Sequence, residues 1–462
     1  MPSSSRVAGP PDGSPLRLPL PALVDAITAG RLCMVEHANA CIAQALAVEP
    51  LIHAFKAIDP AMIRARAEAA GAAGGGVPSG LLAGVPFGVK DIIDVRGLVT
   101  GMGSPIHDDS VAAADAPLVA RMQAAGAFVL GKTVTTEFAF MHPRETRNPW
   151  HTGHTPGGSS SGSAAAVAAG CVPAALATQT NGSVIRPAAF CGIVGFKPSF
   201  GAFPVQGVLS YAPTLDQTGC YARSVDGVTR IARALAEPGF GLDAAGVGAA
   251  ETASGSSNGG GRSPRLGAVR TPVWARASAA MQSGFEHTRA LLSVTGTPIE
   301  VLELPPAFER AHDVHRVIMG YEAVRYFSPV QAMHRNLISE WLNGYLDQSR
   351  AIGEAEYAGA LGDRDRLREA FSRFLSDAGL DAVITPPAPS EAPQGILTSG
   401  DPVFCSIWTL LGTPAITVPI GLGPAGLPLG LQVVGAERSD AALLETAAWC
   451  EARLGFSGLP PA

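Results

Sequence analysis

The stretch Thr155–Gly192, TPGGSSSGSAAAVAAGCVPAALATQTNGSVIRPAAFCG, holds two turns rich in glycine and hydroxyl groups. The first turn is Gly157–Gly162, which a run of small residues follows, and the second is Thr180–Ser183, after a short apolar segment. Glycine lets the backbone bend sharply, and a turn that opens a helix points several N–H groups at one place. Both turns are therefore suited to holding an oxyanion, although turns of this composition are also common as plain loops.

Short apolar strand patterns alternate with helical patterns on both sides of this stretch. Helical spacing of apolar residues predicts two helices within 20–47, broken near Gly30, and further helices over 60–73, 117–126, 275–295, 307–378 and 440–454. Buried strands are predicted over 81–95, 127–131, 266–270, 299–304, 381–385, 415–419 and 429–434. This alternation favours an α/β fold with a mixed sheet.

Two segments are predicted to lie outside the packed core. Residues 1–15 are rich in proline, serine and glycine, which predicts a disordered leader. Residues 242–264 are polar and of low complexity, which predicts a flexible surface insertion. We therefore expect residues 16–462 to form a single domain that carries this insertion.

Composition narrows the class of protein and its partners. The chain has 47% hydrophobic and 16% charged residues, typical of a globular protein, and a net charge of −6 that provides no basic surface for nucleic acid or an anionic membrane. No stretch of about 20 apolar residues and no signal peptide occur, which predicts a cytoplasmic protein. The 7 cysteines are scattered and form no C-x-x-C pair, which indicates reduced, buried thiols.

Two histidine pairs are candidates for metal ligands. His151 and His154 lie in a polar loop without a carboxylate or third ligand at a suitable spacing. His312 and His315 lack the glutamate of the H-E-x-x-H motif. A position on the loop surface is therefore favoured for both pairs, and no metal site is predicted.

Lys90 lies inside the apolar segment LLAGVPFGVKDIIDV (81–95), where a charged residue is unusual. One interpretation is that it extends to the surface or pairs with Asp91 or Asp94. The other is that it is buried, so that desolvation disfavours its charged form and leaves a neutral amine able to act as a base. The residues alone leave both open.

Two catalytic templates fit the first turn poorly. Residues 158–162 match G-x-S-x-G, which would make Ser160 the nucleophile of an α/β-hydrolase. However, a polar, proline-broken loop precedes it instead of a strand, and the last histidine is His334, well before the C-terminal region. A phosphate-binding loop fits less well still, because no G-K-[ST] follows the glycines.

Seven motifs together point elsewhere. From about Leu20 to Gly455 the chain resembles the amidase signature family, in the family's motif order: GVPFGVKD, GKTVTTEF, PGGSSSGSAAAVAAG, GSVIRPAAFCGIVGFKPSFG, ITPPAP, GTPAITVPIG and GLPLGLQVVG. The resemblance implies that family's fold, a central mixed β-sheet flanked by helices on both sides. It also implies a Ser–cis-Ser–Lys triad.

The resemblance assigns the triad to three residues of this chain. Ser183 would be the nucleophile, Ser159 the bridging serine after a cis Gly158–Ser159 bond, and Lys90 the base. A serine hydroxyl needs a base to become a nucleophile, and neutral Lys90 would exchange protons with Ser183 through Ser159. For Lys132 and Lys197, in loop-like settings, we expect structural pairing.

The second turn would bind the oxyanion of the tetrahedral intermediate. We expect the donors to be the backbone N–H groups of Thr180, Asn181, Gly182 and Ser183.

Three positions depart from the commonest pattern of the family. Most members have an acidic residue where Gln179 stands and a second glycine where Asn181 stands. Arg186 follows the nucleophile by 3 residues instead of two, a variant that looks like the malonamidase-type members, in which this arginine holds a substrate carboxylate. An arginine fork suits a carboxylate, but a structural salt bridge beneath the site is an equal alternative for Arg186.

The resulting hypothesis is an amidohydrolase that cleaves the C–N bond of a small carboxylic amide through a seryl acyl-enzyme, without metal or organic cofactor. The alternative is the glutaminase subunit of a tRNA-dependent amidotransferase. The intact triad disfavours a silent binding protein, and the missing N-terminal anchor disfavours a membrane-bound fatty-amide hydrolase.

The resemblance leaves the partners and the substrate open in part. The expected partner is a small-molecule amide, with no nucleic acid and no membrane. Related enzymes are often homodimers, so a homodimer is compatible with the resemblance. We expect Tyr321, Tyr326 and Trp341 to line the substrate pocket.

Overall fold

One large sheet organises the chain. The computed structural model describes residues 6–73, 79–242, 263–294, 296–456 and 460. Within these residues ten strands form a single sheet in the order β2-β1-β3-β5-β4-β9-β10-β8-β6-β7. Their bounds are β1 (Pro86–Lys90), β2 (Phe128–Thr133), β3 (Ala174–Gln179), β4 (Val194–Lys197), β5 (Gln217–Ala222), β6 (Leu266–Arg270), β7 (Glu300–Glu303), β8 (Ala382–Thr385), β9 (Ala415–Leu422) and β10 (Pro428–Gly435).

The sheet is parallel at its two flanks and antiparallel in the middle. Strand β1 pairs in parallel with β2 and β3, and β6 pairs in parallel with β7 and β8. Between these flanks, β3, β5, β4, β9, β10 and β8 pair antiparallel in succession. The predicted mixed sheet is therefore confirmed.

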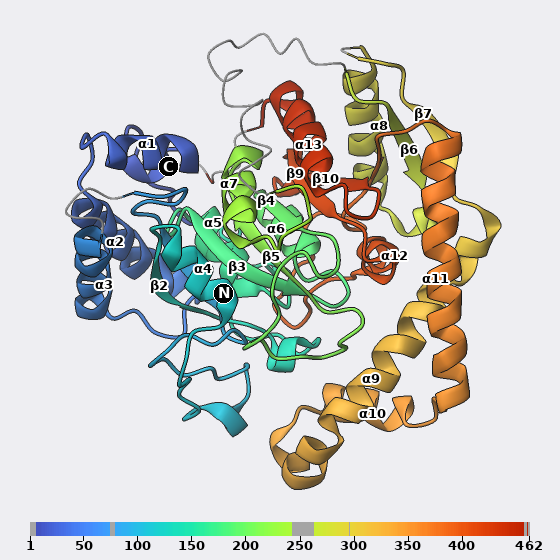
Figure 1. Cartoon of the computed structure of the whole chain (residues 1–462), viewed down its shortest axis with the longest axis horizontal. Coiled ribbons are helices and arrows are strands. Elements are labelled where there is room, and N and C mark those ends of the chain that lie inside the picture. The colour runs from blue at the N-terminus through green and yellow to red at the C-terminus, as the bar shows by residue number, and fades with distance from the viewer. Residues whose placement is uncertain (1–5, 74–78, 243–262, 295, 457–459, 461–462) are drawn as a thin grey trace.

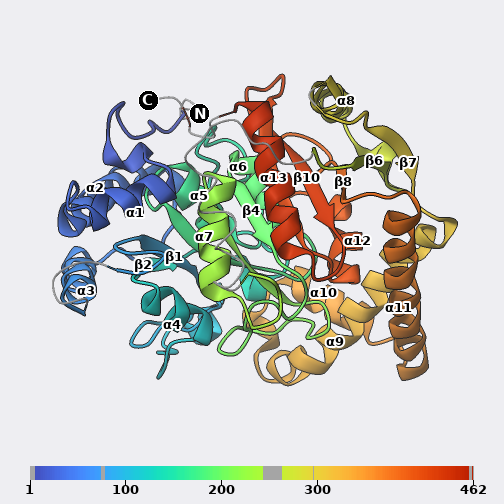
Figure 2. The ribbon, with the colours of Figure 1, turned by 45° about the horizontal axis from the view of Figure 1, so that its top comes forward.

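Helices cover both faces of the sheet. The helices are α1 (Leu20–Thr28), α2 (Met34–Ile52), α3 (Pro60–Ala73), α4 (Pro117–Ala124), α5 (Ser161–Ala168), α6 (Ile185–Cys191), α7 (Val225–Leu235), α8 (Ala279–Val294), α9 (Ala311–His334), α10 (Glu340–Ser349), α11 (Glu354–Asp377), α12 (Val403–Leu411) and α13 (Asp440–Leu454). Helices α7 and α13 pack together in front of the central strands, and α5 and α6 pack together behind them (Figure 2). The α/β architecture with helices on both sides is confirmed.

A helical arm extends from one side of the sheet. Helices α9, α10 and α11 form this arm, which lies away from the N-terminal helices (Figure 1). Helix α9 joins the arm to the rest of the molecule through α12. The arm therefore brings residues distant in sequence close to the central strands.

The run of small residues in the first turn allows close packing. All residues of α5 are buried, and this helix packs against β1, β2 and β3. A Cβ at Gly162 would collide with the backbone of Ala54 and Val134, so only glycine fits there. This close packing sets the first turn directly over the end of β1.

Most predicted helices and strands are present, but several central elements, β5 and α12 among them, were not predicted. Strand β5, QTGCYA, contains polar residues and a glycine, although all its residues are buried between two strands. Helix α12, VFCSIWTLL, is short and buried on all sides, and a short apolar run of this kind does not distinguish a helix from a buried strand. The predicted strand 81–95 shrinks to β1.

The disordered leader predicted over 1–15 needs correction. Residues 1–5 lie outside the described residues, but Val7 is buried and its N–H donates a hydrogen bond to the carbonyl of Pro149. The described part of this segment, residues 6–15, therefore contacts the rest of the chain. Of the predicted insertion 242–264, residues 243–262 lie outside the described residues.

Two further expectations concern the cysteines and membrane-spanning segments. The 7 cysteines are unpaired, and all are buried except Cys33, which is exposed. No helix among the described residues is long and apolar enough to cross a membrane.

Candidate active site

Lys90 is the last residue of β1 and is fully buried. Its Nζ donates hydrogen bonds to Oγ of Ser159 and Oγ1 of Thr178, both at 2.7 Å. Asp91 instead forms an ion pair with Lys132 at 3.1 Å, so a surface position or an aspartate partner for Lys90 is wrong. Burial holds the pKa of Lys90 well below its usual 10.5, which favours the neutral amine.

Two neighbouring elements supply the hydroxyl groups that surround Lys90. Ser159 is buried just before α5 and follows a cis Gly158–Ser159 peptide bond, as the resemblance implies. Thr178 lies on β3, the strand beside β1. The sequence analysis missed Thr178, although it stands two residues before Thr180 and strand alternation places both on one face.

The second turn, Thr180–Ser183, connects β3 to α6, and Gln179 fixes its far end. The Oε1 of Gln179 accepts hydrogen bonds from the N–H groups of Val184 (2.8 Å) and Ile185 (3.0 Å). Its Nε2 donates to Oγ1 of Thr409 at 2.9 Å. An amide makes both kinds of bond, whereas a carboxylate cannot donate, which accounts for glutamine at this position.

Asp216 holds the near end of the second turn. Its Oδ1 accepts a hydrogen bond from Oγ1 of Thr180 at 2.6 Å, and its Oδ2 accepts from Oγ of Ser210 and N–H of Tyr211 at 2.9 and 2.7 Å. Burial raises the pKa of Asp216 to about 6. The sequence showed Asp216 only as part of a turn, and no local pattern distinguishes it from a solvent-exposed turn aspartate.

His315 reaches the same turn from α9. Its Nε2 lies 3.0 Å from the carbonyl oxygen of Thr180, and burial lowers its pKa to about 4. The neutral ring therefore donates its Nε2–H to that carbonyl. The predicted position on the loop surface is wrong for His315 and also for His312, which lies on the same helix with its Nε2 2.9 Å from the carbonyl oxygen of Val403. The apolar neighbours of His315 on this helix, Val314 and Ile318, were the available signal.

Ser183 lines a cleft of about 470 Å³, part of it open to solvent, together with Asn181, Gly182 and Arg186. The carbonyl of Ser183 accepts a hydrogen bond from the Tyr221 hydroxyl at 3.1 Å. Among the described residues, the Ser183 hydroxyl and the backbone N–H groups from Asn181 to Ser183 make no hydrogen bond. These groups therefore remain available to a ligand in the cleft.

Arg186 connects the two turns. It is buried on α6, and its Nη2 donates to the carbonyl of Gly158 at 2.6 Å and to Oγ of Ser399 at 3.3 Å. Its Nε and Nη1 have no hydrogen-bond partner in the described part of the chain, and no carboxylate there forms an ion pair with it. The predicted alternative of a structural salt bridge is wrong, and a buried cation with open donors borders the cleft.

Ser160 is placed differently from the nucleophile of an α/β-hydrolase. It is fully buried at the start of α5, and its Oγ donates to the carbonyl of Thr178 at 3.3 Å. No strand precedes it directly. Ser160 therefore stabilises the first turn instead of facing the cleft.

The other two lysines are structural, as predicted, but both lie in strands and not in loops. Lys132 on β2 pairs with Asp91. Lys197 ends β4, and its Nζ donates to Oε1 of Gln217 (2.6 Å) and to the carbonyls of Pro198 (3.1 Å) and Thr413 (2.5 Å).

The cleft walls differ from those predicted. Phe140, Met141, Tyr211 and Met319 line the cleft. The predicted residues Tyr321, Tyr326 and Trp341 do not: Tyr321 stacks on Tyr357, and the other two are exposed. Among the described residues, no three His, Cys, Asp or Glu side chains gather where they could hold a metal ion.

Comparison with solved structures shows enzymes that share this fold. A 6-aminohexanoate cyclic dimer hydrolase, solved with its substrate, superposes with a TM-score of 0.81 at 25% identity, covering 96% of this chain and 99% of that chain. The peptide amidase from Stenotrophomonas maltophilia superposes with a TM-score of 0.78 at 27% identity, covering 96% and 98%. By name the first is a hydrolase and the second an amidase.

Comparison of sequences gives the family. The chain is 34% identical over 461 residues to the A-type subunit of the glutamyl-tRNA(Gln) amidotransferase of Symbiobacterium thermophilum, covering 91% of this chain and 93% of the relative. This name gives no support to the narrower resemblance to malonamidase-type members. The model of the family described as "Amidase" matches residues 36–444. The chain therefore belongs to the amidase family and is an amide-cleaving hydrolase.

Proposed function

We propose that this chain hydrolyses a small amide whose acyl part carries a carboxylate, through an acyl-enzyme on Ser183 with Lys90 as the base and Ser159 as the proton relay. The observation that carries the proposal is a fully buried Lys90 whose Nζ contacts two hydroxyl groups and, among the described residues, no carboxylate. A neutral amine beside a hydroxyl is the arrangement that activates a serine in the absence of histidine.

The first step is the acylation of Ser183, and its protons balance as follows. Neutral Lys90 accepts the proton of Ser159 while Ser159 accepts that of Ser183, and Oγ of Ser183 bonds to the carbonyl carbon. When the tetrahedral intermediate collapses, the C–N bond breaks, and the proton returns from Lys90 through Ser159 to the leaving nitrogen. An amine and a Ser183 ester result.

The second step repeats the first with water as the nucleophile. Water attacks the ester and passes one proton to the relay, and Oγ of Ser183 regains a proton as it leaves. The products are the carboxylic acid and the free enzyme. In both steps the unpaired N–H groups of Asn181, Gly182 and Ser183 would stabilise the oxyanion, each donor contributing roughly 3 kcal/mol.

Arg186 supports the carboxylate in the proposed substrate. Its Nε and Nη1 are buried, without a protein partner among the described residues, and border the same cleft as Ser183. A buried cation is costly without a partner, and a carboxylate accepts two hydrogen bonds from a guanidinium.

The test compares succinamate with butyramide, which has the same chain length without the carboxylate. We expect kcat/KM to be at least tenfold higher for succinamate with the native chain, and Arg186→Gln to remove most of this difference. Because Arg186 also holds the Gly158 carbonyl, a purely structural role would lower both rates by the same factor, which would contradict the proposal. Ser183→Ala, inactive on both amides, measures the background.

A second candidate is the glutaminase subunit of a tRNA-dependent amidotransferase. The 34% identity to the A-type subunit of a glutamyl-tRNA(Gln) amidotransferase over nearly the whole chain favours it. Glutamine also carries a carboxylate, so Arg186 fits either candidate. The expectation of no nucleic-acid partner rests on the net charge of −6 alone, and this relative's name brings tRNA into the second candidate.

The two candidates differ in what the isolated chain does. A free-standing amidase cleaves its amide alone at full rate. A glutaminase subunit releases ammonia from glutamine slowly alone and much faster when other subunits and charged tRNA are added. Ammonia release from glutamine, measured with the purified chain and with cell extract of its source added, separates them.

A further inference from the structure

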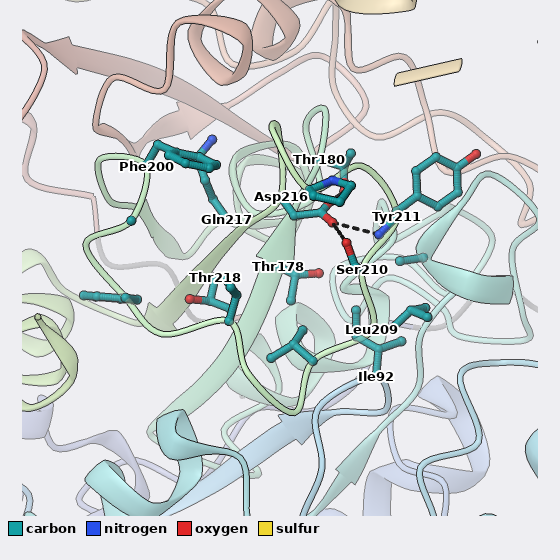
Figure 3. A pocket seen from close by; sticks show the side chains of 16 residues that line it. Ile92, Thr178, Thr180, Phe200, Leu209, Ser210, Tyr211, Asp216, Gln217 and Thr218 are labelled. Atoms are coloured by element: carbon teal, nitrogen blue, oxygen red, sulfur yellow. Dashed lines mark hydrogen bonds between the residues drawn. The ribbon is translucent and has the colours of Figure 1, made fainter. Parts of the chain in front are cut away.

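A second pocket lies beside the cleft and is mostly apolar. It encloses about 740 Å³ including its open side, and its lining consists mainly of apolar side chains: Ile92, Phe200, Phe203, Val205, Val208 and Leu209 (Figure 3). Phe200 and Val205 are partly exposed and mark the open side, whereas Ile92 is buried at the inner end. The volume suits a small organic group.

The inner end of this pocket borders Thr178, a hydrogen-bond partner of Lys90. Thr178 lines the pocket, and its Oγ1 accepts a hydrogen bond from Nζ of Lys90, whose other partner is Ser159. Figure 3 shows the side chains of Thr178, Leu209 and Ile92 around the same space. The pocket thus lies one hydrogen bond away from the lysine.

The pocket and the cleft meet at shared residues. Ala139, Thr180 and Tyr211 line both of them. The cleft contains Ser183 and Arg186, while the pocket contains neither. The two cavities therefore adjoin around the second turn, one on the side of the nucleophile Ser183 and the other on the side of Thr178 and Lys90.

The reaction assigns different halves of the amide to these two cavities. The carbonyl carbon must reach Ser183, and a carboxylate on the acyl part would bind Arg186, so the acyl half occupies the cleft. The leaving nitrogen must receive the proton that Lys90 took up, so its substituent points to the side of Lys90. There the walls are apolar and the only titratable carboxylate of the lining is Asp216, which disfavours an anionic substituent and suits an amine.

We propose that this pocket binds the amine half of the substrate, so that the natural substrate is an N-alkyl or N-aryl amide and not a primary amide. The proposal rests on the proposed function and adds the class of leaving group. A primary amide such as glutamine releases ammonia, which would leave the apolar walls without a contact. The pocket therefore favours the free-standing amidase over the glutaminase subunit.

The experiment uses N-methyl- and N-hexylsuccinamate, whose acyl parts are identical and whose leaving amines have similar basicity. Each methylene buried in an apolar pocket strengthens binding. We expect kcat/KM to be at least tenfold higher for the N-hexyl amide, measured by release of the amine. Equal values for the two amides would overturn the proposal.

Variants test whether the preference for the N-hexyl amide arises in this pocket. Val208→Trp fills the pocket and is expected to lower kcat/KM at least tenfold more for the N-hexyl than for the N-methyl amide. The matched control is Val294→Trp at the exposed end of α8 (86% exposed), which should change neither value. Equal losses on both amides in Val208→Trp would contradict the assignment. If that variant does not fold, Val205→Trp at the open side replaces it.

A binding measurement separates this proposal from the proposed function. Hexylamine is the product that the pocket would hold, and calorimetry detects its binding without turnover. We expect hexylamine to bind the native chain and Ser183→Ala equally, and Val208→Trp at least tenfold more weakly. Turnover of both amides without hexylamine binding would refute the pocket alone, whereas hexylamine binding without any turnover would refute the proposed function alone.

Discussion

Lys90 and Lys197 are both fully buried lysines that end a strand of the same sheet, β1 and β4 respectively. Neither forms an ion pair with a carboxylate among the described residues. Their partners differ in kind. The Nζ of Lys90 contacts the hydroxyls of Ser159 and Thr178, whereas that of Lys197 contacts two backbone carbonyls and the amide oxygen of Gln217.

The difference decides what each lysine can do. A hydroxyl both donates and accepts, so it can pass a proton to a neutral amine and take it back. Carbonyl and amide oxygens only accept, so three of them match the three donors of an ammonium group. Burial lowers both pKa values, that of Lys197 to about 7, but only Lys90 has partners that can relay a proton. Burial alone therefore does not identify a base.

The most direct test of this difference between Lys90 and Lys197 is to replace each lysine by methionine. Lys90→Met removes the base, and we expect kcat to fall on the order of 10³-fold. Lys197→Met, assayed at a temperature where it remains folded, should keep kcat within about threefold, because its hydrogen bonds are structural. Initial rates of amine release measure both. A similar fall in the two variants would show that the kind of partner does not separate their roles.

The two hydroxyl partners of Lys90 provide the next test. Ser159→Ala removes the relay and should slow turnover about 10²-fold. Thr178→Val removes one partner of Lys90 but leaves the relay, so we expect a loss of about tenfold or less. Steady-state kinetics of the two variants give the order. A greater loss in Thr178→Val would mean that Thr178, and not Ser159, connects Lys90 to the nucleophile.

Stability should show the opposite ranking of the two lysines. Lys197→Met leaves three buried acceptors without a donor, which we expect to lower the free energy of unfolding by about 3 kcal/mol or more. Lys90→Met removes a buried amine, and the hydroxyls that it leaves can donate as well as accept, so the change should stay within about 1 kcal/mol. Urea unfolding followed by fluorescence measures both values. Equal losses would argue that both lysines serve mainly to hold the fold.

The smallest expected effect concerns pH. Turnover needs neutral Lys90, so kcat/KM should rise with pH and reach its plateau well below pH 10.5, since burial lowers this pKa. The charge of Asp216 favours protonated Lys90 and so raises its pKa. Asp216→Asn should therefore move the rising limb to lower pH, by about one unit or less.

Lys197 is the control for this profile, because its pKa of about 7 makes it another candidate for the same limb. Lys197→Met should leave the limb in place. If the limb disappears in Lys197→Met and persists in Asp216→Asn, the profile reports Lys197 and not Lys90.

The motifs made much of the site predictable. The family pattern placed Lys90, Ser159 and Ser183 in one constellation, and the structure brings Lys90 and Ser159 into hydrogen-bond contact after a cis peptide bond. The catalytic role of all three remains a prediction. The spacing of apolar residues also located most helices, because a helix with one buried face carries apolar residues at every third or fourth position. Helix α12 has no exposed face, and its short apolar run does not distinguish it from a buried strand.

Other residues of the site could not be predicted from the sequence. Three residues of the site look ordinary in the sequence: a strand threonine (Thr178), a turn aspartate (Asp216) and a helix histidine (His315). Each becomes part of the site only through a partner distant in sequence. The choice between a salt bridge and open donors at Arg186 likewise depended on which side chains packed around it.

The sequence by itself determined the chemical groups, their order, the family and the α/β alternation, because these depend on residue type and local spacing. Only the tertiary structure decided which lysine meets hydroxyls, which meets carbonyls, and where an apolar pocket adjoins a polar cleft. The physical reason is that the pKa of a side chain and the binding preference of a pocket depend on desolvation and on the nearest partners. Packing brings those partners together from distant parts of the chain.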